Sequence, residues 1–283
     1  MLARRRQMTQ RKRSKINVRI PAALAGLCLL RVCMMYATHR DALPRDAIDE
    51  VRVPTQGFVI AMNNETGWRV ARRLQQAFGI RDMHVVVGHV GNVSTMALYN
   101  QHLMRNRRTD TLQIGNLNML GCLESHREAW TRVTQVSYIF EEDAVPAAGA
   151  LRTVKTLLLD NVDRHWSVIH LEPPSGFVSR NIITPDVGQY TNIGKITQTC
   201  RDCIVYSNRG YIITKEAAQI LLQHYEPPVV QADAYMSLMN AYHPRFKQVW
   251  TRVQAVDWSP HISSIQEFEL ISVKHVLLNL IKQ

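Results

Sequence analysis

Short apolar runs alternate with amphipathic stretches along most of this chain. Residues 57–62 and 83–87 are apolar runs with strand character, and each ends at polar residues or glycine. Between them, apolar side chains recur from Trp68 to Phe78 at spacings of three and four, which predicts one buried face of a helix. A strand, a helix and a strand within about thirty residues form a βαβ unit, so this region predicts a parallel sheet.

The alternation continues through the rest of the chain and predicts an α/β fold in one domain, with a mostly parallel sheet flanked by helices. Polar segments over 101–118 and 172–206 are expected to be loops, and long loops in compact domains are usually functional. The further strands are expected at 136–140, 166–171, 210–213 and 248–256, and the further helices at 123–133, 147–159, 215–225, 232–242 and 266–282.

The chemical signal is strongest where the apolar run 136–140 leads directly into Glu141, Glu142 and Asp143. Ligands bind at the carboxyl ends of strands in open α/β sheets. Adjacent carboxylates repel each other unless a cation offsets their charge, and a divalent metal with oxygen ligands does so while bridging to substrate phosphates. A solvated acidic turn after a strand is the alternative interpretation of the same three residues.

The residues before and after this acidic turn carry a resemblance to a known family. They read Gly121-Cys-Leu-Glu-Ser-His126, then Trp130, then Tyr138-Ile-Phe140 and the three acids, followed later by Gly210-Tyr-Ile-Ile-Thr-Lys-Glu-Ala-Ala and by Asp233. In order and spacing this resembles the lipopolysaccharide glycosyltransferase family that includes the collagen hydroxylysine galactosyltransferases, glycosyltransferase family 25. The resemblance covers roughly residues 56–265, and it implies a GT-A-like fold.

The resemblance also implies a function, which is the transfer of a hexose, galactose or glucose, from a nucleotide-sugar such as a UDP-hexose. The acceptor would be a hydroxyl of a glycan, of a lipopolysaccharide-like molecule or of a protein. Glu142 and Asp143 would hold Mn²⁺ or Mg²⁺ on the diphosphate, and a metal there acts as a Lewis acid. The implied donor-binding residues are Glu141, Ser125, His126 and Arg69, with packing of His126 on a helix face as the alternative.

Members of this family invert the configuration at the sugar, and inversion needs a base that deprotonates the acceptor hydroxyl. Asp233 is the first candidate for this base, with a helix cap as its alternative role. Asp257 and His261 follow, and His261 is also a candidate metal ligand. Glu142 stands where the family has aspartate, so a catalytically inactive relative that serves as a binding partner is the alternative function.

Composition agrees with an enzyme-sized folded domain, because 46% of the 283 residues are hydrophobic and 20% are charged. The net charge of +11 would suggest a polyanion partner. However, residues 1–19 contain eight basic side chains and no acidic one, which leaves an excess of three positive charges on the rest of the chain. No nucleic-acid partner is therefore expected for the folded part.

The basic segment precedes an apolar run at 20–37 that contains Arg31. Basic residues before an apolar run are typical of a signal anchor. This interpretation makes 1–19 a cytoplasmic tail, 38–55 a stem and 56–283 a glycosyltransferase domain in the lumen of the endoplasmic reticulum or Golgi. An organelle transit peptide, or neither signal, remains open, because the leader is rich in arginine and has no acid before Asp41.

Two of the five cysteines, Cys200 and Cys203, form an isolated C-x-x-C. A structural zinc site needs a second pair of ligands at suitable spacing, and none follows. The pair is therefore expected to be either a local disulfide or two unremarkable thiols.

Overall fold

The computed structural model forms a compact unit within Asp46–Gln283. The residues that the structure describes are 48–94, 117–174, 191–201, 203, 205, 208–224 and 231–258. The expected tail, the anchor at 20–37, most of the loops at 101–118 and 172–206, and the closing helix at 266–282 lie outside them. Ile48 is buried, and the Lys155 ammonium donates to the Asp49 carbonyl, so the residues just before the first strand belong to the folded unit. None of the helices described here is long and apolar enough to cross a membrane.

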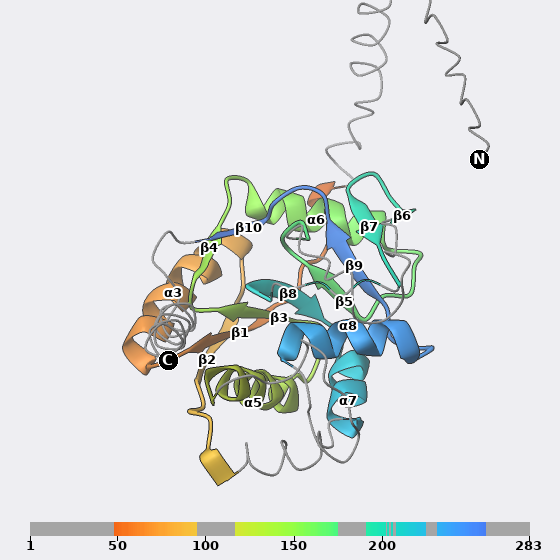
Figure 1. Ribbon diagram of the computed structural model, residues 1–283. Helices are drawn as coiled ribbons and strands as arrows, with labels where there is room; N and C mark the ends of the chain where they lie inside the picture. The colour runs from red at the N-terminus through yellow and green to blue at the C-terminus, as the bar shows by residue number, and fades with distance from the viewer. Residues whose placement is uncertain are drawn as a thin grey trace, which may run out of the picture. The chain divides into compact units, whose positions relative to one another are not determined.

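An eight-stranded mixed sheet forms the centre of the unit (Figure 1). Its strands, in spatial order, are β2 (Asp82–Val87), β1 (Gln56–Ala61), β3 (Ser137–Glu141), β8 (Gly210–Ile213), β5 (Val168–His170), β9 (Gln248–Thr251), β7 (Thr197–Thr199) and β6 (Thr191–Asn192). Only β8 and β7 run against the others, because β1 pairs in parallel with β2 and β3 while β8 is antiparallel to both β3 and β5. The predicted α/β fold with a mostly parallel sheet is confirmed.

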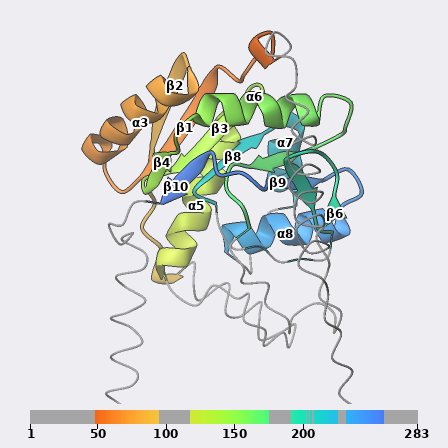
Figure 2. The same ribbon diagram turned by 90° about the horizontal axis from the view of Figure 1, so that it is seen from above.

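Helices cover both faces of the sheet, as Figures 1 and 2 show. Along β1, Val59 packs on the face under α3 (Asn64–Phe78) and α6 (Ala150–Asp160), whereas Phe58 and Ile60 pack on the opposite face. That opposite face carries α5 (Leu117–Arg132), α7 (Lys215–Gln223) and α8 (Ala232–Tyr242). Successive side chains of a strand point to opposite faces, and here both faces are apolar because helices cover both.

Helix α3 follows β1 as predicted, but its buried face differs from the expectation at one position. The Asn63 side chain accepts the Thr66 amide at the start, and Gly79 ends the helix at φ 69°, which is a conformation suited to glycine. The expectation that Trp68 lies on the buried face is wrong, because its side chain is 43% exposed. Gly67 faces the sheet instead, where a Cβ would lie 2.5 Å from Val85 Cγ1, so the helix approaches β2 through its backbone.

Two other boundaries differ from the sequence expectation. Helix α5 begins at Leu117, earlier than expected, and takes in the end of the predicted loop. The strand expected at 248–256 divides into β9 and β10 (Val256–Trp258). β10 leaves the main sheet and pairs antiparallel with β4 (Ala144–Pro146), which follows the acidic turn directly.

The C-x-x-C pair is a disulfide between Cys200 and Cys203. Both cysteines are buried and form a small apolar cluster with Val205 and Trp250 beside β9. The Asn240 side chain of α8 donates to the Cys200 carbonyl at 2.8 Å, which ties this turn to the helix. The disulfide thus fixes a turn that has little regular structure of its own.

We predict that replacing both Cys200 and Cys203 with serine lowers the free energy of unfolding by about 2 kcal/mol, because the chain-entropy contribution of so short a loop is of that size. Urea unfolding with and without a reducing agent measures the effect. The reducing agent should lower the stability of the wild-type protein and leave that of the serine variant unchanged. Equal stability of the two proteins without reducing agent would contradict the prediction.

Candidate functional site

Three carboxylates and one guanidinium meet at the edge where β3 and β5 end. β3 ends at Glu141, and Glu172 follows β5 after a single intervening residue. Because β8 runs in the opposite direction between these strands, Arg209 enters its strand at the same edge. Asp143, in the turn after β3, completes the group, which we call the acidic edge and define as Glu141, Asp143, Glu172 and Arg209.

The Arg209 side chain connects two carboxylates of the acidic edge, those of Asp143 and Glu172. Its Nη1 lies 2.5 Å from Glu172 Oε2, its backbone amide donates to Glu172 Oε1 at 3.2 Å, and its Nε lies 3.7 Å from Asp143 Oδ2. The Glu141 amide donates to the Arg209 carbonyl at 2.9 Å, so the backbones are joined as well. A Cβ at Gly210 would lie 2.9 Å from Val256 Cγ2 and 3.0 Å from Phe140 Cδ1, so the strand is closely packed beside Arg209. One cation therefore faces three carboxylates.

Asp143 has a raised pKa, and the charge imbalance is one of its causes. Burial, followed by the negative charge of Glu141, raises the pKa of Asp143 to about 7, although Arg209 acts in the opposite direction. The side chain is only 10% exposed, and among the described residues its Oδ1 has no hydrogen-bond partner. A buried carboxylate oxygen without a donor is costly, and a cation bound there would satisfy it.

A chain of hydrogen bonds from α5 to β3 orients Glu141. Trp130 Nε1 donates to the Tyr211 hydroxyl at 2.9 Å, and that hydroxyl lies 2.9 Å from His126 Nδ1. His126 Nε2 lies 3.1 Å from Glu141 Oε1. If the Tyr211 proton points to Nδ1, the imidazole carries its own proton on Nε2 and donates it to Glu141, so every donor in the chain is used.

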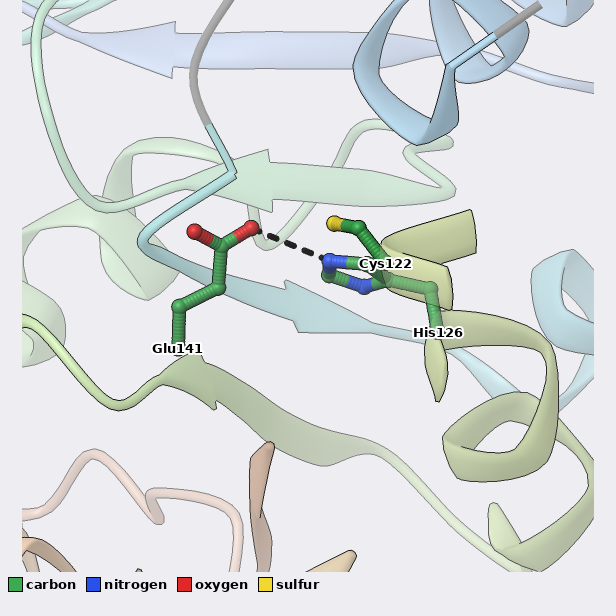
Figure 3. Close-up of side chains that lie close together, drawn as sticks. All are labelled: Cys122, His126 and Glu141. Carbon is green, nitrogen blue, oxygen red and sulfur yellow. Dashed lines mark hydrogen bonds and ion pairs between the residues drawn. The ribbon is translucent and has the colours of Figure 1, made fainter. Parts of the chain in front are cut away.

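Cys122 lies one helical turn before His126 and adds a sulfur to the same place. Figure 3 shows both side chains of α5 directed toward Glu141 at the end of β3, and the ligand atoms of the three residues lie within 4.8 Å of one another. Burial, then the charges of Glu141, Asp233 and Asp143, raises the pKa of the Cys122 thiol well above its usual range. Sulfur, imidazole nitrogen and carboxylate oxygen together suit Zn²⁺, whereas carboxylate oxygens alone suit Mg²⁺ or Mn²⁺.

The structure therefore offers two overlapping donor sets that share Glu141. The oxygen set consists of Glu141 and Asp143, and the mixed set consists of Cys122, His126 and Glu141. His126 has the support that metal-binding histidines normally have, since its other ring nitrogen is held by Tyr211. The Asp143 oxygen, which has no partner in the part of the chain that the structure describes, makes the oxygen set the better fit to Mg²⁺ or Mn²⁺.

Two of the expected site residues, Ser125 and Glu142, make hydrogen bonds that join separate segments of the fold, and a third, Arg69, points to solvent. The Ser125 hydroxyl donates to the Gly121 carbonyl and accepts the His89 amide, so it fixes the loop after β2 against α5. The Glu142 carboxylate accepts the Met62 amide at 3.0 Å, at the end of β1. Arg69 is exposed on α3.

The candidate bases lie in different parts of the fold. Asp233, in the first turn of α8, lies close enough to Cys122 for its charge to raise the thiol pKa, so it faces the same region as the acidic edge. Asp257 lies in β10 opposite Val145 and accepts a hydrogen bond from Gln254 at 2.9 Å, and its side chain is exposed. His261 lies outside the described residues.

Sequence reasoning missed Arg209 and Glu172, which complete the acidic edge. Glu172 follows an apolar run just as Glu141 does, so the signal of an acid at a strand end was present in the sequence. Arg209 stands directly before a run that was correctly expected to be a strand, but only the antiparallel direction of β8 brings it to this edge. No sequence signal gives that direction.

No protein-family model matches this sequence, and no curated protein matches it. Among solved structures, a UDP-glucose pyrophosphorylase complexed with UDP-glucose has 10% identity and a TM-score of 0.42, over 70% of this chain and 90% of that chain. A UTP-bound UGPase from Acinetobacter baumannii has 14% identity and a TM-score of 0.40, over 70% and 86% of the two chains. A 4-diphosphocytidyl-2C-methyl-D-erythritol synthase from Anaerococcus prevotii has 10% identity and a TM-score of 0.37, over 76% and 94%. Similarity at this level says nothing about what this chain binds.

We predict that Asp143→Asn raises thermal stability at neutral and alkaline pH. The pKa of about 7 means that folded Asp143 keeps its proton up to near-neutral pH, whereas the unfolded carboxyl releases it near 3.8. The folded state therefore loses stability as the pH rises between these two values, by on the order of a few kcal/mol in total. The neutral amide removes this loss, so the variant should gain most above about pH 7 and nothing near about pH 4.

Thermal unfolding in the presence of a metal chelator, followed across this pH range, measures the difference. The matched control is Asp163→Asn, because Asp163 is exposed and its substitution should change little at any pH. A stability gain that is the same at every pH would contradict the prediction, since it would not come from the proton on Asp143.

Proposed function

We propose that this chain is a metal-assisted glycosyltransferase that moves a hexose from a nucleotide-sugar to a hydroxyl acceptor with inversion. The observation that carries the proposal is the state of Asp143, which is buried, has a pKa raised to about 7, and has an oxygen without a partner in the described residues. Such a carboxylate at the carboxyl edge of an α/β sheet is suited to a divalent cation that arrives with a diphosphate.

The resemblance to the lipopolysaccharide glycosyltransferase family adds support from residues that the fold brings together. Cys122, His126 and Glu141 come from the block of sequence that carries the resemblance, and their ligand atoms lie within 4.8 Å of one another. Glu141 and Asp143 would hold Mn²⁺ or Mg²⁺, which would neutralise charge on the departing nucleoside diphosphate. Arg209 positions Asp143 and Glu172 and leaves the second oxygen of Asp143 without a described partner.

In this proposal Asp233 is the base. Its carboxylate takes the proton of the acceptor hydroxyl, the acceptor oxygen forms a bond to the anomeric carbon, and the bond from that carbon to the diphosphate oxygen breaks. The nucleoside diphosphate leaves with the electron pair. The charge of Asp233 acts on the Cys122 thiol from the first turn of α8, where its Oδ1 accepts the Ala234 amide at 2.8 Å. Asp257 is exposed on β10, so the position of Asp233 favours it as the base.

We further propose that the domain works in the lumen of the endoplasmic reticulum or Golgi, anchored through residues 20–37 as a type II membrane protein. The disulfide between Cys200 and Cys203 supports this, because disulfides persist in oxidising compartments and are rare in the cytosol. Protection of the folded domain from protease in intact microsomes would test the location, and digestion in intact microsomes would contradict it.

The activity is tested by incubating the protein with UDP-, GDP- and CMP-sugars, with and without Mn²⁺, while released nucleotide is measured. We expect one donor to be used in a metal-dependent reaction. Asp143→Asn should lower turnover at least about a hundredfold, because the metal and the diphosphate lose a ligand. The control variant Asp163→Asn should stay within about twofold of the wild-type protein, since an exposed side chain far from such a site rarely matters.

Two further results have a defined meaning. If Cys122→Ser keeps its Mn²⁺-dependent activity while Asp143→Asn loses it, the oxygen set holds the metal. If neither donor binding nor nucleotide release occurs with any sugar, the glycosyltransferase proposal is wrong. The alternative of an inactive relative then applies, and Glu142→Asp is the first variant to test for restored activity.

A further inference from the structure

A cavity of about 770 Å³ lies at the opposite edge of the sheet from the acidic edge. It is bordered by the residues that lead into β5 and β9, among them His165 and Lys247. β5 is parallel to β9 and ends beside the acidic edge, so the starts of these strands lie at the other end of the sheet. A cavity of this volume is within the usual range for small-molecule sites.

The cavity is lined by positive charge. Arg164, Arg201 and Lys247 all line it, and none of the three forms an ion pair with a carboxylate among the described residues. No Asp or Glu is found among the described residues of the lining. Of the carboxylates nearby in the fold, Asp160 accepts the Ile196 amide and Glu216 pairs with Arg245 at 3.4 Å. Asp163 is exposed and is not part of the lining.

The negative ends of two helices offset only part of this positive charge. The C-caps of α6 and α8, Asn161 and His243, both line the cavity, and a helix C-terminus carries about half a negative charge. Two such ends offset about one of the three permanent cations, so a surplus of about two positive charges remains. That surplus matches a phosphate monoester, which carries about −1.5 to −2 at neutral pH.

Two polar groups suggest that the ligand is larger than a bare anion. Asn161 is 1% exposed and lines the cavity, and its Oδ1 has no hydrogen-bond partner among the described residues. A buried amide oxygen is an acceptor, so it suits a hydroxyl donor rather than a phosphate oxygen. His243 Nδ1 also lacks a described partner. We infer that this basic cavity binds a hydroxyl-bearing phosphate monoester, of the sugar phosphate class, at a site separate from the acidic edge.

The test titrates the full chain with glucose 1-phosphate, inorganic phosphate and glucose in a metal-free buffer, by calorimetry. We expect glucose 1-phosphate to bind more tightly than inorganic phosphate and glucose to bind far more weakly than either. Replacing both Arg164 and Arg201 with glutamine should weaken glucose 1-phosphate at least about tenfold, since each lost charge-assisted hydrogen bond costs that much or more.

The matched control replaces Arg72 and Arg73 with glutamine. Both are exposed on α3, which packs against β1 and β2 and not against β5 or β9. This control removes the same net charge and keeps the basic residues at 1–19, so its affinity should stay within about twofold of the wild type. Asp143→Asn should also keep its affinity, which separates this site from the proposed catalytic one. Equal losses in the two arginine pairs would overturn the inference, because the binding would then follow net charge alone. Equal binding of inorganic phosphate and glucose 1-phosphate would overturn the sugar phosphate class.

A second measurement follows the pKa of His243, which lines the cavity. Withdrawal from water, then the positive charges of His224 and Arg245, lower the pKa of His243, with Glu216 acting in the opposite direction. A bound phosphate would add negative charge beside the ring and raise this pKa. NMR titration of His243 should show that rise with glucose 1-phosphate, and an unchanged His243 pKa at saturation would contradict the site.

Discussion

The contact between the Arg209 guanidinium and the carboxylates of Asp143 and Glu172 is the interaction on which the candidate site depends. Three segments that are distant in sequence end at this point, and each brings a charge that the sheet would otherwise bury without compensation. Burial and the neighbouring charge of Glu141 raise the pKa of Asp143, and the single cation of Arg209 does not offset them. The fold tolerates this imbalance at the edge of the sheet where ligands bind, and a charged ligand would relieve it.

The surroundings of this contact are buried and joined by hydrogen bonds. Trp130, Tyr211 and His126 are buried and linked by hydrogen bonds, so they hold Glu141 in one orientation. Ser125 in turn fixes the loop after β2 to the same helix. A site with buried, mutually oriented side chains is preorganised for ligand binding, whereas a solvated acidic turn would have none of these supports.

The two edges of the sheet carry opposite charge. Carboxylates gather where β3 and β5 end, and cations without an ion pair among the described residues gather where β5 and β9 begin. The chain's overall charge hides this separation, because most of the net positive charge comes from residues 1–19. Charge at each edge therefore says more about ligands than the net charge does.

The sequence by itself determined the class of the fold and the position of the first acids. Alternating apolar runs gave the strands and helices close to their observed places, because hydrophobic periodicity is a local property. It also indicated Glu141 and Asp143, since both follow an apolar strand. Only the tertiary structure placed Arg209, Glu172 and Tyr211 in the site, turned Trp68 outward and directed Glu142 to the Met62 amide. The reason is physical: strand direction, the close approach allowed by Gly67 and hydrogen bonds across the sheet depend on pairings between distant segments, which no local pattern encodes.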